Sequence, residues 1–586
     1  MKTRKLIGHR ILLLAALIAV ALPATLQAQF TFVTNDDSTI TITGYGGPGG
    51  DVVIPDSTNG LPVTRIDDGA FINHYFLTNI TIPASVINIG NYAFYYCNRL
   101  TGVVIPNNVT NIGYEAFEDC GNMTNLIIGA KVIGIGVDAF DGCYSLPNLV
   151  IPDSVVYLGR SAFNSCTTAT NLALGNNLVL IGDQAFENCE KLTKITIPGT
   201  DTYLGNYAFA DCSGLTNVVM MNGVAEIGGL AFYQCSSLAS VTIPDSVTSI
   251  GSLAFYGCTN LACLVVPNGV ATIGNNAFEF CSGLTNLFIG SSVTNIGLPM
   301  IQDCPNLPAV VVDTNNPAYC DVDGVLLDKK QTTLMECPGG RAGSFTIPEG
   351  VTNITQYAFY NCAGLTSVVI PDSVVSIWHD AFDGCTSLTA VALPKGVTRL
   401  EDSVFTSCRS LTNVVIPDGV NYIGYSAFSG CGNLTRITIP ESVASLGQNA
   451  FSGCGNLIAV YFNGNVPAII SDYDLFFNST NATVYHFPGA TGWPNSFGER
   501  PTFLWNPQMD SVNAFAGMPT NQFRFTITGD YGMTIVVESC SNLARPSWTA
   551  VGTNKLDLYI NTNGTSYFSD PQWTNSPTRF YRLRSP

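Results

Sequence analysis

The chain has 586 residues, of which 46% are hydrophobic and only 11% charged, and its formal net charge is −18. This composition excludes an intrinsically disordered chain and supplies enough apolar residues for a large core. An acidic chain with so few Lys and Arg residues is also a poor candidate for binding nucleic acid or an anionic membrane surface.

Residues 1–28 have the pattern of a secretory signal peptide. Four basic residues accompany an apolar core from Ile11 to Ala21, and Ala28 is the expected last residue before cleavage. The apolar run is short for a membrane span. We therefore expect an exported mature chain, secreted or on the cell surface, whose charge falls from −18 to −22 when the four basic residues are removed.

A repeat of 23 residues occupies residues 71–304 and 346–462. Phe recurs in fifteen of sixteen copies, nearly always after Ala, and a Cys follows three residues later in fifteen copies. In one copy, LASVTIPDSVTSIGSLAFYGC, the L-x-x-L-x-L spacing predicts a short strand that ends at Pro244, because proline has no N–H to extend a ladder. The Ala254, Phe255 and Cys258 spacing predicts a short helical or 3₁₀ segment.

A single copy cannot bury its own apolar residues, so the copies must stack. The predicted fold is an α/β repeat solenoid, with a parallel sheet on one face and short helical or 3₁₀ segments on the other. With strands about 4.8 Å apart, sixteen coils predict a sheet roughly 75 Å long.

Two further regions depart from the repeat. Residues 305–345 interrupt its register and are predicted to form a hairpin insertion, with strands at 325–327 and 333–335 around Lys329 and Lys330. Residues 506–586 contain four strand-like segments separated by Gly, Asn, Ser and Pro, which predict a small all-β domain, a sandwich.

The repeated signature I-G-x-x-A-F-x-x-C-x-x-L-x-x-V-x-I-P resembles that of BspA-like leucine-rich repeat proteins of bacterial surfaces. The resemblance implies adhesion or the binding of host and matrix proteins, without naming a ligand. It also implies that residues 29–70 form an N-terminal β cap and residues 463–505 a C-terminal cap. The ending RFYRLRSP resembles a module of secreted bacterial proteins, which implies a sorting or attachment role for residues 506–586.

The regular spacing of the cysteines predicts buried packing residues rather than a disulfide framework. We expect the coils to stand roughly 8–10 Å apart at the Cys column, which exceeds the Cα separation of a disulfide. Cys320 and Cys337 flank the predicted hairpin and form a candidate disulfide in an oxidising compartment.

No catalytic constellation can be assembled from the sequence. His74, His379 and His486 lie on different coils, far from one another in the chain. Wide spacing of the cysteines argues against a metal cluster. We expect no catalytic residues, metal or cofactor, and no enzymatic activity.

The outward positions of the predicted sheet are the candidate ligand-binding site. One column is largely apolar or β-branched and almost uncharged, which is unusual on an open sheet of a soluble protein; strand propensity alone explains part of it. We name it the valine column, and it runs through Thr81, Val104, Ile127, Val150, Ala173, Thr196, Val219, Thr242, Val265, Phe288 and Val311, then Val369, Ala392, Val415, Thr438 and Tyr461. A neighbouring asparagine column contains Asn79, Asn125, Asn148, Asn171, Asn217, Asn286 and Asn413.

These columns predict a non-enzymatic scaffold that binds an extracellular protein or polysaccharide through the sheet. The strongest candidates are Thr196, Val219, Thr242, Val265, Phe288, Val311, Asn217 and Asn286. Two alternatives stay open: a self-associating structural surface protein, and an extracellular glycan-active enzyme with its site in residues 506–586. That segment contains no His, so it offers little for catalysis.

Overall fold

The computed structural model describes residues 29–200, 202–470, 474–506, 508–510, 523–529, 534–541, 548–555, 564–570 and 580–584. The expected signal peptide lies outside these ranges. The chain divides into two compact units: the first runs up to Lys329 and includes 338–340, and the second comprises 330–337 and 341–586.

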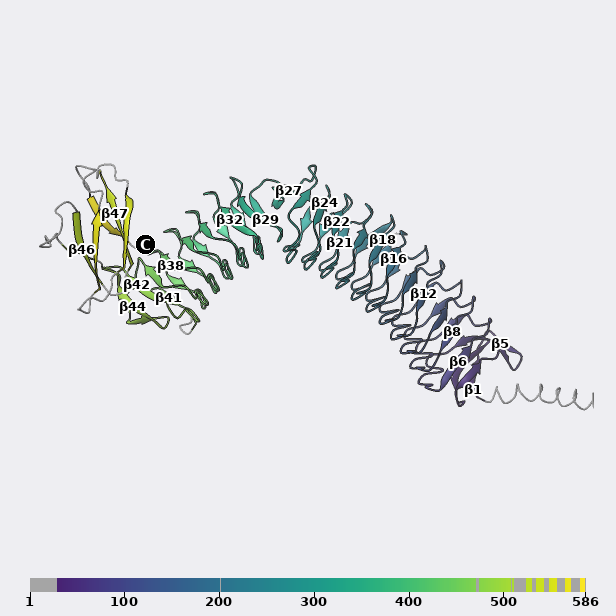
Figure 1. The fold of residues 1–586 in the computed structure, drawn as a ribbon. Coiled ribbons are helices and arrows are strands. Elements are labelled where there is room, and N and C mark those ends of the chain that lie inside the picture. Colours follow the sequence, from purple (N-terminus) through teal and green to yellow (C-terminus); the bar gives the residue numbers. More distant parts are fainter. Residues whose placement is uncertain are drawn as a thin grey trace, which may run out of the picture. The chain divides into compact units, whose positions relative to one another are not determined.

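The predicted solenoid is confirmed, since each repeat forms one coil and the coils stack in sequence order (Figure 1). The first strand of each coil contains the L-x-x-L-x-L residues, and we call these the face strands. In the first unit they are β6 (Leu77–Thr81), β8 (Gly102–Val104), β10 (Asn125–Ile127), β12 (Asn148–Val150), β14 (Asn171–Ala173), β16 (Lys194–Ile197), β18 (Asn217–Met220), β20 (Ser240–Thr242), β22 (Cys263–Val266), β24 (Asn286–Ile289) and β26 (Val310–Val312).

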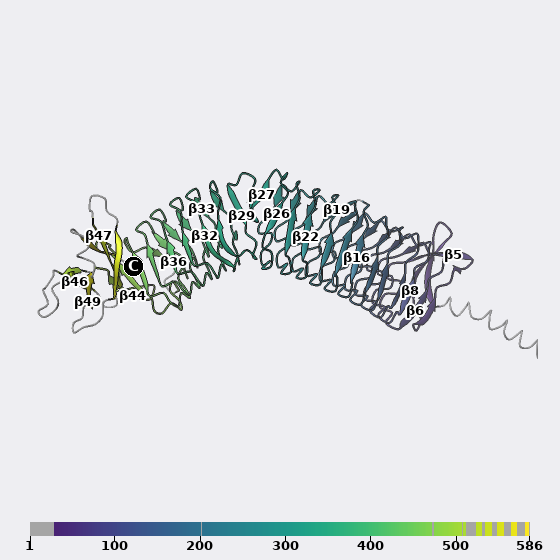
Figure 2. The ribbon, with the colours of Figure 1, turned by 45° about the horizontal axis from the view of Figure 1, so that its top comes forward.

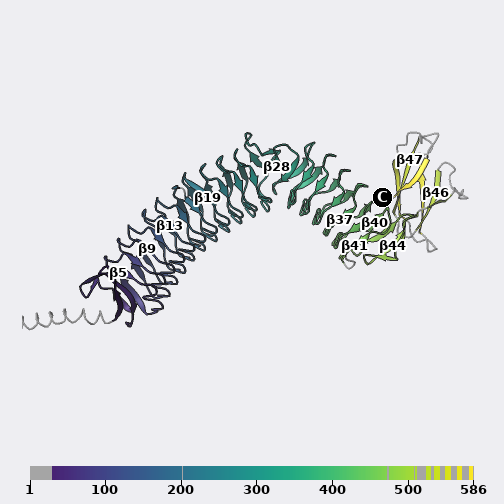
Figure 3. The ribbon, with the colours of Figure 1, turned by 180° about the vertical axis from the view of Figure 1, so that it is seen from behind.

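A second, shorter strand in each coil was not predicted, and these ladder strands form the longest sheet. They pair in parallel without interruption, and strands of the N-terminal region extend the sheet to fourteen strands. Several are labelled in Figure 3. They are β7 (Asn88–Ile89), β9 (Asn111–Ile112), β11 (Gly134–Ile135), β13 (Tyr157–Leu158), β15 (Leu180–Ile181), β17 (Thr202–Leu204), β19 (Val224–Ile227), β21 (Ser249–Ile250), β23 (Thr272–Ile273) and β25 (Asn295–Ile296), preceded by β1 (Phe30–Thr34), β2 (Ile40–Tyr45), β4 (Ser57–Thr58) and β5 (Leu61–Ile66).

The prediction of one long sheet on the binding side is wrong. The face strands pair only in short groups: β3 (Gly50–Val53) with β6, β8 with β10, β12 with β14, β16 to β20, and β22 to β26. Figure 2 labels β8, β16, β22 and β26 of this series. The continuous ladder therefore lies at the second strand of each coil, and the face strands form several small sheets.

The predicted helical or 3₁₀ segments are also wrong, because no helix occurs among the described residues, and hence none long enough to cross a bilayer. The Ala-Phe segment is a series of tight turns with left-handed residues four apart, such as Tyr207 (φ 56°) and Asp211 (φ 57°). A helix needs right-handed φ throughout and N–H bonds to the residue four back. Here the Phe209 N–H instead donates to the Ala231 carbonyl of the next coil at 2.8 Å.

The Phe residues of this turn form the centre of the core. Neighbouring rings from Phe94 to Phe255 stack with centroids 4.9–5.7 Å apart, and each ring is fully buried. The expected burial of the Cys column is confirmed as well. Each thiol also contacts a carbonyl of the preceding coil; Cys212 Sγ lies 3.2 Å from the Phe186 oxygen.

The same carbonyl contact is made by other residues at the ends of the repeats. His74 Nε2 lies 2.7 Å from the Tyr45 oxygen in the first coil. After the last repeat, the Ser479 hydroxyl donates to the Phe451 carbonyl at 2.7 Å. The side chain at the Cys position thus makes a hydrogen bond to one buried backbone oxygen in each coil.

The expected 8–10 Å separation of coils at the Cys column is wrong. Backbone hydrogen bonds of 2.8 Å and ring separations near 5 Å hold the coils close together on this side. Burial raises the pKa of the Cys189 thiol to about 12, so this thiol is largely protonated, and poorly reactive, at neutral pH. Burial and the protonated state of the thiol, rather than a wide separation of the coils, therefore account for the packing role of these cysteines.

The insertion in the first unit contains an antiparallel hairpin of β27 (Tyr319–Val322) and β28 (Val325–Asp328). The Asp323-Gly324 turn between them has positive φ at both residues, as a tight two-residue hairpin requires. Strands also occur at both predicted positions, as β28 and as β29 (Thr333–Glu336), and the β27 strand is an addition that was not predicted. The candidate disulfide joins Cys320 of the first unit to Cys337 of the second and stays a prediction.

The second unit has the same two series of strands. Its ladder strands are β29 (Thr333–Glu336), β31 (Asn353–Ile354), β33 (Ser376–Ile377), β35 (Arg399–Leu400), β37 (Tyr422–Ile423), β39 (Ser445–Leu446) and β41 (Ala468–Ile469). Its face strands are β30 (Gly343–Thr346), β32 (Leu365–Val369), β34 (Ala390–Ala392), β36 (Asn413–Val415), β38 (Arg436–Ile439), β40 (Ala459–Phe462), β42 (Thr483–His486) and β44 (Arg500–Leu504), with β43 (Ser496–Phe497) antiparallel to β44. The ladder is interrupted between β33 and β35, and the last face strands, from β38 on, form one five-stranded sheet with β43.

The C-terminal strands form two three-stranded antiparallel sheets, as the prediction of a small β domain implies. They are β45 (Gln508–Asp510), β46 (Phe523–Gly529) and β49 (Gly564–Asp570) in one sheet, and β47 (Thr534–Cys540), β48 (Thr549–Lys555) and β50 (Phe580–Arg584) in the other. Their buried residues Ile527, Ile535, Val537 and Phe568 share one cluster with Ala459, Tyr461, Tyr485 and Trp505. The C-terminal strands therefore cover the face strands β40 and β42.

This contact corrects the prediction for Tyr461. The residue belongs to the valine column, as expected, but only 1% of its surface is exposed. Its ring stacks on that of Tyr485 with centroids 5.3 Å apart. Tyr461 is thus unavailable to a ligand, because residues distant in sequence bury it.

Replacing Phe209 by Ala is expected to destabilise the first unit by about 3–5 kcal/mol, because the substitution leaves a cavity in the ring stack. Urea unfolding followed by circular dichroism would show this as a lower midpoint. Tyr207→Ala, on an exposed ring of the same coil, is the control and should shift the midpoint much less. Equal shifts for the two variants would contradict the central role of the ring stack.

A chain that ends after Trp505 is expected to expose Tyr461 and Tyr485 and to bind a hydrophobic dye such as ANS. The shortened chain should also unfold at a lower urea concentration than the full chain. Tyr461→Asp in the full chain should produce the same two changes. Full stability and no dye binding in both variants would show that the C-terminal strands do not protect this end.

Candidate functional site

The outward columns lie on the face strands, as predicted from the repeat. Parallel pairing aligns Lys194 with Asn217, and Thr196 with Val219, so each column crosses successive strands at one register. The alternating residues Ile195 and Val218 point inward and are buried. Side chains of the two columns therefore stand next to one another on the same surface.

The valine column presents apolar side chains to solvent over many coils. Seven Val and Ile residues of this column are at least half exposed, from 50% at Val311 to 60% at Val150. Of the predicted site residues, Thr196, Thr242, Val265, Val311 and Asn286 are exposed, and Val219, Phe288 and Asn217 are half-buried. All eight belong to the first unit.

Two hollows divide the predicted residues between them. The larger encloses about 530 Å³ and is lined by twelve residues that include Asn217, Thr196 and Val219. The smaller encloses about 240 Å³ and includes Val265, Phe288, Val311 and Asn286. Thr242 lines neither of them. The structure thus brings the predicted residues together as two shallow sites rather than one continuous stripe.

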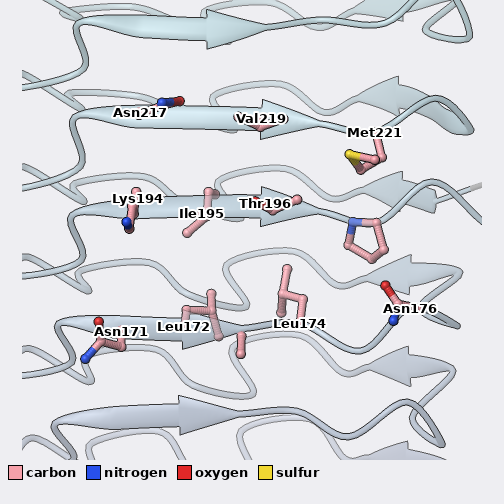
Figure 4. Close-up of a pocket in the computed structure, with 12 residues that line it drawn as sticks. Asn171, Leu172, Leu174, Asn176, Lys194, Ile195, Thr196, Asn217, Val219 and Met221 are labelled. Carbon is pink, nitrogen blue, oxygen red and sulfur yellow. The ribbon is translucent and has the colours of Figure 1, made fainter.

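The larger hollow lies where the pairing of the face strands is interrupted, between β14 and β16. At this interruption the inward residues Leu172 and Leu174 are half-buried, whereas Ile195 and Ile197 of β16 are buried. Figure 4 shows Leu172, Leu174 and Ile195 among the residues that line the hollow. The hollow therefore gives access to apolar core residues as well as to the outward columns.

A glycine in place of proline accompanies this interruption. Gly175 occupies the position that Pro152 holds in the preceding coil. A Cβ atom at Gly175 would lie 2.4 Å from the Pro152 carbonyl oxygen, so only glycine allows this approach. The strand β14 pairs with β12 and not with β16. Gly290 has the same close approach to Pro267, but its strand β24 still pairs with β26, so glycine alone does not cause the interruption.

Figure 4 shows how the residues are distributed along the larger hollow. Asn171, Lys194 and Asn217 stand where the three strands begin, whereas Leu174, Asn176 and Met221 lie at and beyond the strand ends. Lys194, Met221, Leu172 and Leu174 were absent from the predicted site. The strand register identifies Lys194, since it occupies a place in the asparagine column.

A second polar region lies at the Ala-Phe turns of the second to fourth coils. Aromatic rings crowd there, with Tyr92 and Tyr114 at 5.2 Å between centroids. Burial and a hydrogen bond with Glu115 raise the pKa of the Glu118 carboxyl to about 8. Burial also raises the pKa of Asp141 to about 6. These acids destabilise one another when ionised, and we assign them no ligand.

The three histidines of the described residues have separate partners, as their wide spacing predicts. His379 contacts Asp380 at 2.8 Å, and His486 stacks on Trp493. His74 contacts the Tyr45 carbonyl. No group of three His, Cys, Asp or Glu side chains within the described ranges could hold a metal ion.

Comparison with known proteins identifies the repeat. The model of the BspA type leucine-rich repeat region matches residues 64–178, 133–262, 202–318 and 341–485. No curated protein matches the chain. A leucine-rich repeat protein of Bacteroides ovatus is 25% identical, with 71% of this chain and 94% of that chain covered and a TM-score of 0.47. A leucine-rich cell surface protein of Faecalibacterium prausnitzii is 26% identical, with 79% and 94% covered and a TM-score of 0.34.

Replacing Glu118 by Gln is expected to stabilise the protein at pH 8.5 and to have little effect at pH 4. Because the folded-state pKa of Glu118 is raised from 4.5 to about 8, its contribution to stability is complete below pH 4.5 and is lost as the pH rises through about 8. Urea midpoints measured from pH 4 to pH 9 would test this.

Exposed Glu226 of the same unit provides the matched control, and Glu226→Gln should change the pH profile much less. A wild-type protein whose stability rises steadily from pH 4 to pH 8, unaffected by Glu118→Gln, would contradict the assignment.

Proposed function

Because the chain belongs to the BspA-type leucine-rich repeat family, we propose that it is an exported, non-enzymatic scaffold that binds an extracellular partner on its face strands. The observation that supports this most directly is the exposed valine column. Val104, Ile127 and Val150 are at least half exposed on three successive coils, and four more Val residues of the column are equally exposed further along. Apolar surface of this kind is typical of interaction sites.

The two hollows provide the shape that a flat sheet lacks. Ligand sites are concave and mostly apolar, with a few polar groups that fix orientation. The smaller hollow combines the exposed Val265 and Val311 with the amide of Asn286. Partner side chains that enter these hollows would bury apolar surface at a gain of about 25 cal/mol per Å².

The proposed location is the cell surface or the extracellular medium, following the signal-peptide pattern at residues 1–28. The C-terminal β domain is proposed to attach or sort the protein. A chain without this domain that reached the same location at the same level would contradict the attachment role, provided that its fold is intact.

Arg substitutions at Val265 and Phe288 are expected to weaken partner binding at least tenfold, because they place a charge in the smaller hollow. The mature protein would first be screened against extracellular proteins and polysaccharides, and the best partner then titrated with each variant. Urea midpoints should stay near the wild-type value, since neither residue is fully buried.

Val179→Arg is the matched control, because Val179 is 43% exposed beside the ladder strand β15 and not on a face strand. Wild-type affinity in both face variants would overturn the proposed binding surface. Sedimentation at several concentrations separates binding of a partner from self-association, which would appear as concentration-dependent assembly lost in the same variants.

A further inference from the structure

We propose that the larger hollow, between β14 and β16, recognises an extended acidic peptide, with a carboxylate on Lys194 and an aliphatic side chain against Leu172 and Leu174. This inference rests on the proposed function and specifies the chemistry of its partner. It assigns the hollow a ligand of two parts, one that meets Lys194 at the start of β16 and one that meets the leucines within and just after β14 (Figure 4).

Lys194 gives the hollow its charge preference. Between Asn79 and Val311, it is the only charged residue in the two outward columns. Its side chain is exposed, and it forms no ion pair with any described residue. In a chain of net charge −18, a lone ammonium group on the exposed face marks a site for an anion.

The amides beside Lys194 complete an anion site. Asn171 and Asn217 occupy the same register on the two adjacent coils and line the hollow with Lys194. The Asn171 side-chain nitrogen donates to Asn148 Oδ1 at 2.8 Å and to Thr170 Oγ1 at 3.3 Å, which orients this amide within the column. The Lys194 ammonium and the Asn217 amide supply the donors that a carboxylate accepts.

The apolar part of the hollow fits an aliphatic side chain rather than a sugar ring. Its lining includes Leu172, Leu174, Pro198 and Met221 but no aromatic residue on which a sugar could stack. Ala173 leaves space at the centre, where the preceding coil has Val150. Unbranched and flexible, Met221 can adjust to side chains of different shape.

The length of the hollow matches a short extended peptide. From Lys194 to Ile197, the strand β16 advances about 10 Å at 3.3 Å per residue. Two peptide residues that are two or three positions apart span about 7–10 Å. A segment with an acidic residue and an aliphatic residue at that separation can therefore contact Lys194 and the half-buried leucines together.

The test uses carrier protein that displays many copies of Leu-Ser-Thr-Glu or Glu-Ser-Thr-Leu, with Gln in place of Glu as the neutral comparison. We expect the full mature protein to retain the Glu carriers at least fivefold better than the Gln carriers at low salt. The preference should fall as sodium chloride screens the ion pair. Lys194→Gln should abolish the preference, and Ala173→Trp should reduce retention of both carriers about tenfold by filling the hollow.

Two matched variants serve as controls. Lys191→Gln removes the same charge from an exposed residue that does not line the hollow. Ala392→Trp adds the same ring at the equivalent repeat position of the second unit. Both should behave as wild type, and urea midpoints should show that every variant is folded.

Several outcomes would overturn the inference. A preference for Glu that survives in Lys194→Gln would exclude the ion pair, and absence of any Glu preference in the wild type would exclude an acidic peptide. Capture of polygalacturonate through Lys194, without capture of the peptides, would assign the hollow to an acidic glycan instead. If Val265→Arg weakens partner binding but Lys194→Gln binds the carriers as the wild type does, only this inference fails. If no face-strand variant changes any binding, the proposed function fails as well.

Discussion

Backbone hydrogen bonds between adjacent Ala-Phe turns set the spacing on which the rest of the structure depends. Left-handed residues such as Tyr207 turn alternate N–H groups along the stack, so that Phe209 bonds to Ala231 of the next coil. The turns then lie close enough for the Phe rings to stack at 4.9–5.7 Å. Helices would need these N–H groups for themselves and are wider, so the repeat cannot contain them.

The face strands follow the spacing between coils that the Ala-Phe turns determine. In the first unit they pair in groups of two or three, and one separation lies after the coil that contains Gly175. Separation half-exposes Leu172 and Leu174, which a continuous sheet would bury. The shape of the candidate site thus follows from small differences in coil spacing, and its chemistry follows from Lys194 and the amides beside it.

The sequence predicts most of what depends on the repeat period. The burial of Phe209 and Cys212, the inward orientation of Ile195 and the outward register of Val265 all follow from position within 23 residues. The turns were mistaken for helices because Tyr207 and Asp211 are not glycines, and their left-handed φ leaves no clear mark in the sequence.

Features that depend on distant residues or on coil spacing were missed. Tyr461 is buried by residues between positions 527 and 568, which no local pattern connects to it. The hollow at Lys194 depends on how two strands separate, which no single residue type marks in the sequence. Periodicity predicts which way a side chain points, but not what covers it.

Within the uninterrupted repeats, the contact between the Cys thiol of one coil and a carbonyl 26 residues earlier has a consequence for how the gene can change. Within the array, the Cys212 thiol contacts the Phe186 carbonyl just as the Cys235 thiol contacts the Phe209 carbonyl. Duplication or loss of one whole 23-residue segment therefore restores these contacts at the junction. At the ends the partners differ, with His74 on the Tyr45 carbonyl and Ser479 on that of Phe451. Unequal recombination can therefore lengthen or shorten this protein from the middle, whereas the two terminal coils must be inherited intact.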